Sequence, residues 1–217
     1  MGQAKRKRYI TAMHEGSHVV VGLDCGRRLV RCSIVPEDAF GGYGLAVGST
    51  EWEHIGDGTV NVGELVKIAL AGKAAEERMY GNAGESVRSD LAVIYALAWL
   101  ATVCSEKFTP HARLIPLLTG IYCEHPHKVT PRAKRLADEM ISALLPEVRD
   151  ILERRWHDVE LVAGLLLKHG RITPEMIDEV FLLEAVEEEG PADHYGPVVQ
   201  TPWQQRSHAC GLKSQKT

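Results

Sequence analysis

The segment "TAMHEGSHVVVGLDCG", residues 11–26, contains two histidines four positions apart, with a glutamate directly after the first. Residues i and i+4 share one face of an α-helix, so His14 and His18 can direct their imidazoles at one point. Glu15 projects beside them, within reach of a water molecule held at that point. Imidazole nitrogens bind zinc, and a neighbouring carboxylate can act as a general base. The spacing therefore predicts a zinc site with hydrolytic chemistry.

Chance is a minor explanation for this HExxH motif. With 10 histidines in 217 residues, composition alone gives such a match about 0.04 times. The segment from Tyr9 to Asp24 also has helical periodicity, and Gly26 follows it as a typical helix stop. A metal site on a helix is therefore favoured over the alternative, which is two core histidines beside a surface glutamate.

Zinc needs a third protein ligand and a position left open for water. Asp24 lies ten residues after His14, where one HExxH pattern has its last ligand, but that pattern requires a glycine at position 21 to reverse the chain. Val21 would continue the helix, so we exclude Asp24. The carboxylates that still compete lie on later predicted helices: Glu76, Glu77 and Asp90.

The elements that must position these residues predict a mainly α-helical α+β fold with a small antiparallel β-sheet. Alternating apolar residues predict a strand over 29–36, and a glycine-rich turn leads to a second short strand over 43–47. The polar stretch 49–59 is predicted to be a loop, and 109–129 an irregular connection. Predicted helices cover 62–80, 90–107 and most of the chain from Thr130 to about residue 186.

Composition limits the functional classes and the expected compartment. The net charge of −4 gives no general case for nucleic acid. The apolar tract 91–104 is shorter than the roughly 20 residues that span a bilayer, so we expect no membrane segment. The five cysteines form no CxxC pair and no signal segment is visible, so we expect reduced thiols and a cytoplasmic protein.

Five blocks of the sequence resemble, in order, the M41 peptidase domain of FtsH-type AAA+ membrane proteases. They are similar to its HEAGH helix, its strand followed by a Gly-rich loop and edge strand, its LxxxLGGRAAEExxFG helix, its GAxNDLxxAT helix and its closing helices. The blocks are "MHEGSHVVVG", "CSIVPEDAFGGYGLA", "LVKIALAGKAAEERMYG", "SVRSDLAVIYALA" and "WHDVELVAGLLLKHGRITPEMIDEV". The resemblance covers about residues 9–180. We therefore predict a zincin-like, M41-like peptidase domain at 9–186, with a basic flexible arm at 1–8 and a disordered tail at 187–217.

The resemblance also implies roles for individual residues. Glu15 would be the catalytic base. Glu76 and Glu77 would lie next to the metal ligands, and one of them could accept a hydrogen bond from an imidazole and fix the orientation of its ring. Either of the two is also the alternative third ligand. Arg88-Ser89 departs from the family's Ala-Asn or Ser-Asn and changes the charge near the site. The zinc ligands that the resemblance implies are His14, His18 and Asp90.

An extended substrate needs backbone partners, and the predicted strand near 43–47 could supply them by adding the peptide as another strand. Glycines at 41, 42 and 44 leave room for that approach, although a plain hairpin turn explains them equally well. The predicted substrate-binding residues are Gly42, Tyr43, Gly44 and Leu45.

These features predict a zinc metalloendopeptidase that acts on unfolded or flexible polypeptides. It would be ATP-independent in itself, because the sequence has no GxxxxGK[ST] motif. The alternative is a non-catalytic peptide-binding or regulatory module that retains the metal site. A homo-oligomer and a separate ATPase chain acting in trans are both compatible with the resemblance. Cys123, His125 and His127 form a weaker metal candidate, for which a solvated loop is the favoured explanation.

Overall fold

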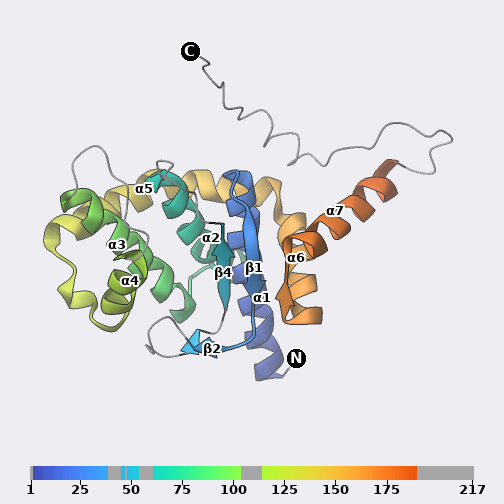
Figure 1. The fold of residues 1–217 in the computed structure, drawn as a ribbon, viewed down its shortest axis with the longest axis horizontal. Helices are drawn as coiled ribbons and strands as arrows, with labels where there is room; N and C mark the ends of the chain where they lie inside the picture. Colours follow the sequence, from blue (N-terminus) through green and yellow to red (C-terminus); the bar gives the residue numbers. More distant parts are fainter. Residues whose placement is uncertain (1, 39–44, 47, 54–60, 104–113, 190–217) are drawn as a thin grey trace, which may run out of the picture.

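The structure, a computed structural model, describes residues 2–38, 45–46, 48–53, 61–103 and 114–189. Within these residues the chain is mainly α-helical with a small antiparallel sheet, which confirms the predicted fold class (Figure 1). The helices are α1 Gln3–Asp24, α2 Val62–Tyr80, α3 Arg88–Val103, α4 Leu114–Glu124, α5 Pro131–Arg154, α6 Trp156–His169 and α7 Pro174–Glu189, with short 3-10 turns η2 Glu85–Val87 and η3 Pro126–Lys128. The strands are β1 Leu29–Ser33, β2 Glu37–Asp38, β3 Leu45–Ala46, β4 Ser49–Trp52 and β5 Arg171–Ile172.

Helix α1 runs through the middle of the molecule and packs against α2 and α6 (Figure 1). Every residue from Ala12 to Gly22 is buried. This part of the helix is in contact with the rest of the protein on all sides, so none of its faces is exposed to solvent. The two histidines and the glutamate of the motif are therefore buried. The helix begins at Gln3, so residues 3–8, which the sequence analysis assigned to a flexible arm, form its first turns.

Helix α2 places the second half of the site beside α1. The side chain of Asn61 caps its start by accepting hydrogen bonds from the backbone N–H groups of Gly63 and Glu64. Gly81 ends it with φ +78°, a left-handed conformation that favours glycine. Because α2 packs against α1, α3 and α5, it fixes where α3 begins relative to α1.

The larger sheet has the order β4-β1-β5, with both pairs antiparallel. Cys32 in the middle strand lies opposite Thr50 of β4 and Ile172 of β5. Strand β4 lies against α1, because the indole of Trp52 occupies the space that a Cβ atom at Gly22 would fill. The sheet therefore covers one side of the central helix.

A strand and a helix lie in stretches that were predicted to be irregular. Strand β4 lies in the stretch predicted as a loop, because its pairing with β1 is a tertiary contact that its polar composition does not signal. Helix α4 lies in the predicted irregular connection, where its Tyr122 is buried against Ala92 and Ala96 of α3. No helix of the described residues is both long and apolar enough to cross a membrane.

Candidate metal centre

The two motif histidines lie close together on a buried part of α1. His14 is 4% exposed and His18 is 7% exposed. Their ring centroids are 4.8 Å apart and the rings meet edge to face. The four-residue spacing therefore gives two imidazoles on one side of the helix, as the helical geometry requires.

Asp90, in the first turn of α3, brings a carboxylate to the same point. Its Oδ2 lies 3.1 Å from Nε2 of His14, and its Oδ1 lies 3.6 Å from Nε2 of His18. One candidate ligand atom from each of these three residues lies within 4.8 Å of the others. No other group of three or more metal-ligating side chains is found in the part of the chain that the structure describes.

The carboxylate excluded from the sequence, Asp24, and one of the competing carboxylates, Glu77, point elsewhere. Asp24 faces Arg155, with 3.8 Å between its Oδ1 and the guanidinium Nη1, in agreement with its exclusion as a ligand. Glu77 forms ion pairs with Lys73 and Arg149. Neither carboxylate belongs to the histidine cluster.

The second nitrogen of each imidazole has its own hydrogen-bond acceptor. Nδ1 of His14 lies 2.7 Å from Oε1 of Glu76, and Nδ1 of His18 lies 2.6 Å from the carbonyl oxygen of Ile68. A carbonyl oxygen can only accept, so Nδ1 of His18 carries a proton, and the carboxylate of Glu76 favours the same for His14. In the neutral rings the lone pair is then on Nε2, which faces Asp90. Metal-ligating histidines have this arrangement.

Glu76 is itself held in place. It is 2% exposed, its Oε2 accepts a hydrogen bond from the backbone N–H of Gly84 at 2.6 Å, and Ser86 Oγ donates to its Oε1. Burial opposes ionisation of Glu76, but the hydrogen bonds from His14, Ser86 and Gly84 outweigh it and lower the pKa. Glu76 is therefore an ionised hydrogen-bond acceptor for Nδ1 of His14.

The residues present fit a divalent cation. Oδ2 of Asp90 is buried and accepts no hydrogen bond among the described residues. Burial disfavours the charged forms, yet contacts within the cluster raise the pKa of His14 to about 10, raise that of His18 and lower that of Asp90. The cluster thus favours positive charge at its centre, from protons or from a metal ion. Two imidazoles and one carboxylate are a donor set that zinc accepts.

Glu15 lies next to this cluster and has a different environment. It is 7% exposed, and Thr50 Oγ1 of β4 donates a hydrogen bond to its Oε2 at 2.8 Å. Burial raises the pKa of Glu15, although His18, His14 and the hydrogen bond from Thr50 act against the shift. A carboxylate with a raised pKa is a stronger proton acceptor near neutral pH than an exposed one.

Residues that no sequence motif indicates also surround these groups. A Cβ atom at Gly72 of α2 would overlap the imidazole of His14, and one at Gly48 would overlap the carboxylate of Glu15. These glycines allow the close approach of α2 and of the chain before β4 to α1. Neither stands in a recognisable motif, so only the tertiary contacts identify them. The other missed contributors are the Ile68 carbonyl, Thr50, Gly84 and Ser86.

Most of the predicted substrate-binding residues lie outside the described residues. These are Gly42, Tyr43 and Gly44. Leu45 is in β3, where its backbone is opposite Asp38 of β2. The assignment of these four residues to substrate stays a prediction.

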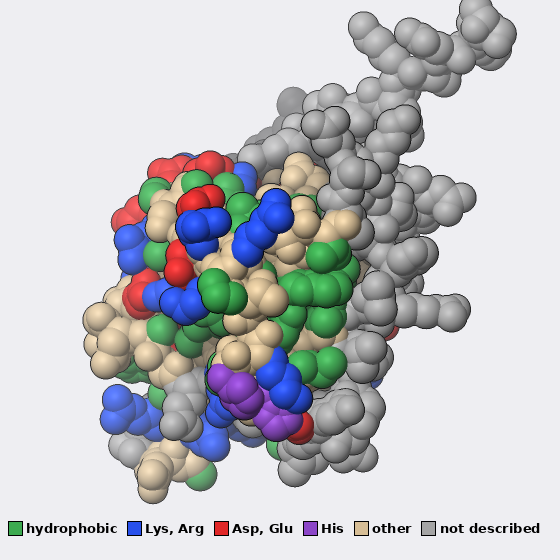
Figure 2. Space-filling view, turned by 90° about the vertical axis from the view of Figure 1, so that its left-hand side faces the viewer, with side chains coloured by type: hydrophobic (Ala, Val, Ile, Leu, Met, Phe, Trp, Pro, Cys, Tyr) green, Lys and Arg blue, Asp and Glu red, His purple; other side chains and the backbone are tan. Residues whose placement is uncertain are grey.

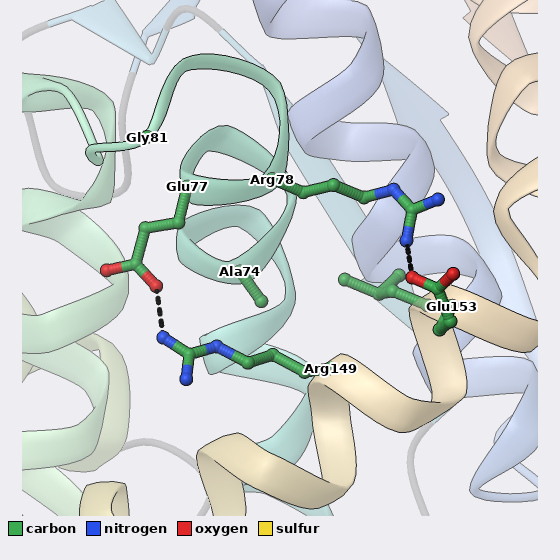
Figure 3. Close-up of a pocket in the computed structure, with 7 residues that line it drawn as sticks. Ala74, Glu77, Arg78, Gly81, Arg149 and Glu153 are labelled. Carbon is green, nitrogen blue, oxygen red and sulfur yellow. Dashed lines mark hydrogen bonds and ion pairs between the residues drawn. The ribbon is translucent and has the colours of Figure 1, made fainter.

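A cavity of about 430 Å³ lies away from the histidine cluster, between α2 and the end of α5 (Figure 3). Two ion pairs line it, Glu77 with Arg149 and Arg78 with Glu153. Its charges are therefore matched within the chain, and it holds none of the clustered ligand atoms. Its remaining lining residues are Ala74, Gly81 and Leu152.

Among the described residues, the weaker metal candidate formed by Cys123, His125 and His127 does not bring three ligand atoms together. His125 and His127 have ring centroids 5.7 Å apart, and Cys123 does not join them in a group of three among the described residues. Histidine side chains are visible at the surface in Figure 2, which faces the end of the molecule formed by α3 and α4. The side chain of His125 is 45% exposed and His127 is exposed, in agreement with the solvated alternative that was favoured from the sequence.

The fold and the cluster together define a mainly helical domain with a largely buried His-His-Asp group whose candidate ligand atoms lie within 4.8 Å of one another. No family model matches the chain. The chain is 27% identical over 185 residues to the ATP-dependent zinc metalloprotease FtsH of Rhodothermus marinus, a match that covers 80% of this chain and 26% of the relative. It is 26% identical over 215 residues to the proteins of the same name from two strains of Streptococcus pneumoniae, covering 90% of this chain and 32% of each relative.

The chain therefore spans between a quarter and a third of the length of these curated relatives. The similarity extends over most of the chain, and it relates the protein to the FtsH metalloproteases at low identity. It supports a protease-related function in general terms.

Proposed function

We propose that this protein is a zinc-dependent endopeptidase that hydrolyses peptide bonds in unfolded or flexible polypeptides. The convergence of Nε2 of His14, Nε2 of His18 and the Asp90 carboxylate carries the proposal. The similarity to proteins named zinc metalloproteases supports it. The proposed domain is residues 9–186, with zinc as its cofactor.

Each residue of the cluster has one role in this proposal. His14, His18 and Asp90 would hold the ion, while Glu76 keeps the His14 ring oriented through Nδ1. A bound zinc ion supplies Lewis acidity, which lowers the pKa of a coordinated water to about 7 and polarises the scissile carbonyl.

Glu15 would perform the proton transfers. Its carboxylate takes a proton from the attacking water and delivers it to the amine of the leaving peptide. Burial raises the pKa of Glu15, which makes its carboxylate a stronger proton acceptor than an exposed one.

The substrate would bind as an extended strand. Strand β4 is at the edge of the three-stranded sheet of the described residues, and it carries the side chain that contacts Glu15. A peptide added at such an edge would run past the base, and the predicted residues Gly42, Tyr43, Gly44 and Leu45 precede this strand in the sequence. A substrate bound in this way must already be extended, which favours unfolded segments. An ATPase acting in trans and a homo-oligomer are further proposals that the FtsH similarity motivates.

The test combines metal analysis with a cleavage assay. Purified protein should contain about one zinc ion per chain and cleave casein or a flexible fluorogenic polypeptide. Glu15→Gln should keep the zinc and lose at least about 100-fold in kcat. Glu147→Gln, which removes an exposed carboxylate on α5 that is paired with Lys67, is the matched control and should leave kcat unchanged.

A protein that binds zinc and peptides but shows no turnover with any flexible substrate would contradict the endopeptidase proposal. That result would favour the alternative of a peptide-binding or regulatory module.

A further inference from the structure

We propose that Thr50 is a positioning residue for Glu15: its hydroxyl, aligned by Cys32, holds one carboxylate oxygen and leaves the other for proton transfer. This inference rests on the proposed peptidase function and adds a residue to that site. The inference is based on the contacts that Cys32 of β1 and Thr50 of β4 make near Glu15 of α1. Both Cys32 and Thr50 lie outside the HExxH motif.

The hydrogen bonds at Thr50 have a defined direction. A threonine hydroxyl has one proton to donate. Oε2 of Glu15, 2.8 Å away, is the carboxylate oxygen that accepts it. Sγ of Cys32 lies 3.3 Å from the same Thr50 oxygen, so the thiol must be the donor in that contact. The chain of donors therefore runs from Cys32 through Thr50 to Glu15.

Pairing of β1 with β4 fixes the relative positions of Cys32 and Thr50 in this series of hydrogen bonds. Cys32 and Thr50 are direct partners in the antiparallel register of β1 and β4, so their side chains lie on the same face. Cys32 is fully buried, and on its other side β1 pairs with β5. Burial raises the pKa of the Cys32 thiol, so it keeps the proton that it donates.

The same segment confines the carboxylate from a second direction. Gly48, two residues before Thr50, lies so close to Glu15 that a Cβ atom at position 48 would overlap the carboxylate. Among the described residues, Oε1 of Glu15 accepts no hydrogen bond, whereas Oε2 has the threonine. The two oxygens are therefore unequal: Thr50 holds Oε2, whereas Oε1 lies beside Gly48, where the missing Cβ atom leaves space next to it.

Loss of the Thr50 hydroxyl should act through the orientation of Glu15. Terminal carboxylate torsions are broad, so without a fixed donor the group samples more orientations. A displacement of about 1 Å can cost about 100-fold in rate. Valine has nearly the shape and the strand preference of threonine, so Thr50→Val removes the hydrogen bond with little change in packing.

Steady-state kinetics on a flexible fluorogenic polypeptide test the inference. Thr50→Val should lower kcat by about 10- to 100-fold, with KM and zinc content within about twofold of the wild type. Thr50→Ser, which keeps the hydroxyl, should recover most of the loss. Thr102→Val is the matched control, because Thr102 is a half-buried threonine whose hydroxyl donates to the Trp99 carbonyl within α3, and kcat of this variant should not change. If Thr50→Val does not fold, Thr50→Ala takes its place.

A double-mutant comparison separates positioning from a general effect on the sheet. In a Glu15→Gln background, Thr50→Val should cause no further loss, because the group through which it acts is gone. An unchanged kcat in Thr50→Val, an equal loss in Thr50→Ser, or a full additional loss in the Glu15→Gln background would each overturn the inference. Wild-type protein that cleaves nothing would overturn the proposed function together with this inference, whereas an active wild type with an unaffected Thr50→Val would overturn the inference alone.

Discussion

Two adjacent glutamates on α2 serve two different regions of the molecule. Glu76 is buried and bonds the Nδ1 side of His14, while Glu77 lines the cavity beside α5 and pairs with Lys73 and Arg149 (Figure 3). Consecutive helix residues are about 100° apart, so they face different neighbours. Glu77, although it directly follows Glu76 and has the same side chain, therefore takes part in an ion-pair network and not in the candidate metal centre.

The two regions differ mainly in their exposure to solvent. Glu76 is buried and bonds His14, Ser86 and Gly84, so removing Glu76 leaves the buried Nδ1 of His14 without a partner. Around Glu77 water and salt screen the charges, and the lost partner can be replaced by solvent. We therefore expect large, specific effects from substitutions in the histidine cluster and small, salt-dependent ones at the cavity.

The largest effect should come from Asp90→Asn. It removes the charge of a proposed ligand, so zinc affinity should fall by more than the roughly 10- to 100-fold typical of residues that only orient a ligand. A competition titration against a chromophoric zinc chelator measures this. Asp24→Asn is the matched control, because Asp24 faces Arg155, and its zinc affinity should equal that of the wild type. Equal affinities for all three proteins would show that Asp90 is not a ligand.

The comparison of Glu76→Gln with Glu77→Gln addresses the two regions directly. Glu76→Gln weakens the acceptor that fixes the His14 ring, and zinc affinity should fall by about 10- to 100-fold. Glu77→Gln changes only the ion pairs of the cavity, so zinc affinity should stay within about twofold. The same competition titration applies, and equal losses in both variants would contradict the assignment of different roles.

Zinc binding should weaken as the pH falls. In the metal-free protein Asp90 and Glu76 outweigh the effect of burial and raise the pKa of His14 to about 10. His14 therefore holds a proton throughout the neutral range, and zinc must displace it. The apparent affinity should fall about tenfold per pH unit for each proton displaced, measured by titration between about pH 6 and about pH 9. An affinity that does not change with pH over this range would exclude proton displacement.

The smallest effect is expected at the cavity. Arg149→Met breaks an ion pair whose arginine is largely exposed, so the free energy of unfolding should change by less than about 1 kcal/mol. Urea unfolding at low and high salt measures this, and the difference from the wild type should decrease as salt rises. A larger, salt-independent loss would mean that the pair behaves like a buried one.

Several features were predictable because their signals are local. The HExxH spacing predicted two imidazoles on one face of a helix, and α1 has them there. Asn61, Gly81 and Thr130 mark helix ends through capping and turn preferences that operate within a few residues. The limits of α2, predicted at 62–80, agree with the structure for this reason.

Other features depended on partners that are distant in the sequence. The stretch that contains Thr50 is polar and was predicted as a loop, but pairing with β1 makes it a strand. Helix α4 was hidden by the prolines around it, and its burial against α3 supplies the stabilisation that its local signals do not suggest. The contacts of Thr50 and Gly48 with Glu15 could not be inferred, because nothing in their own sequence neighbourhood refers to α1.

The sequence by itself determined the chemistry that is available: two imidazoles and a carboxylate on one helix, set by the 3.6-residue period of the backbone. It left open which carboxylate would join the histidines, and only the FtsH resemblance favoured Asp90. The tertiary structure decided this contact, because the packing of α2 against α1 and α3 places Asp90 at the two Nε2 atoms, Glu76 behind His14 and Glu77 at the surface. The direction of a side chain relative to a distant helix depends on how the helices pack, and a local sequence pattern does not contain that information.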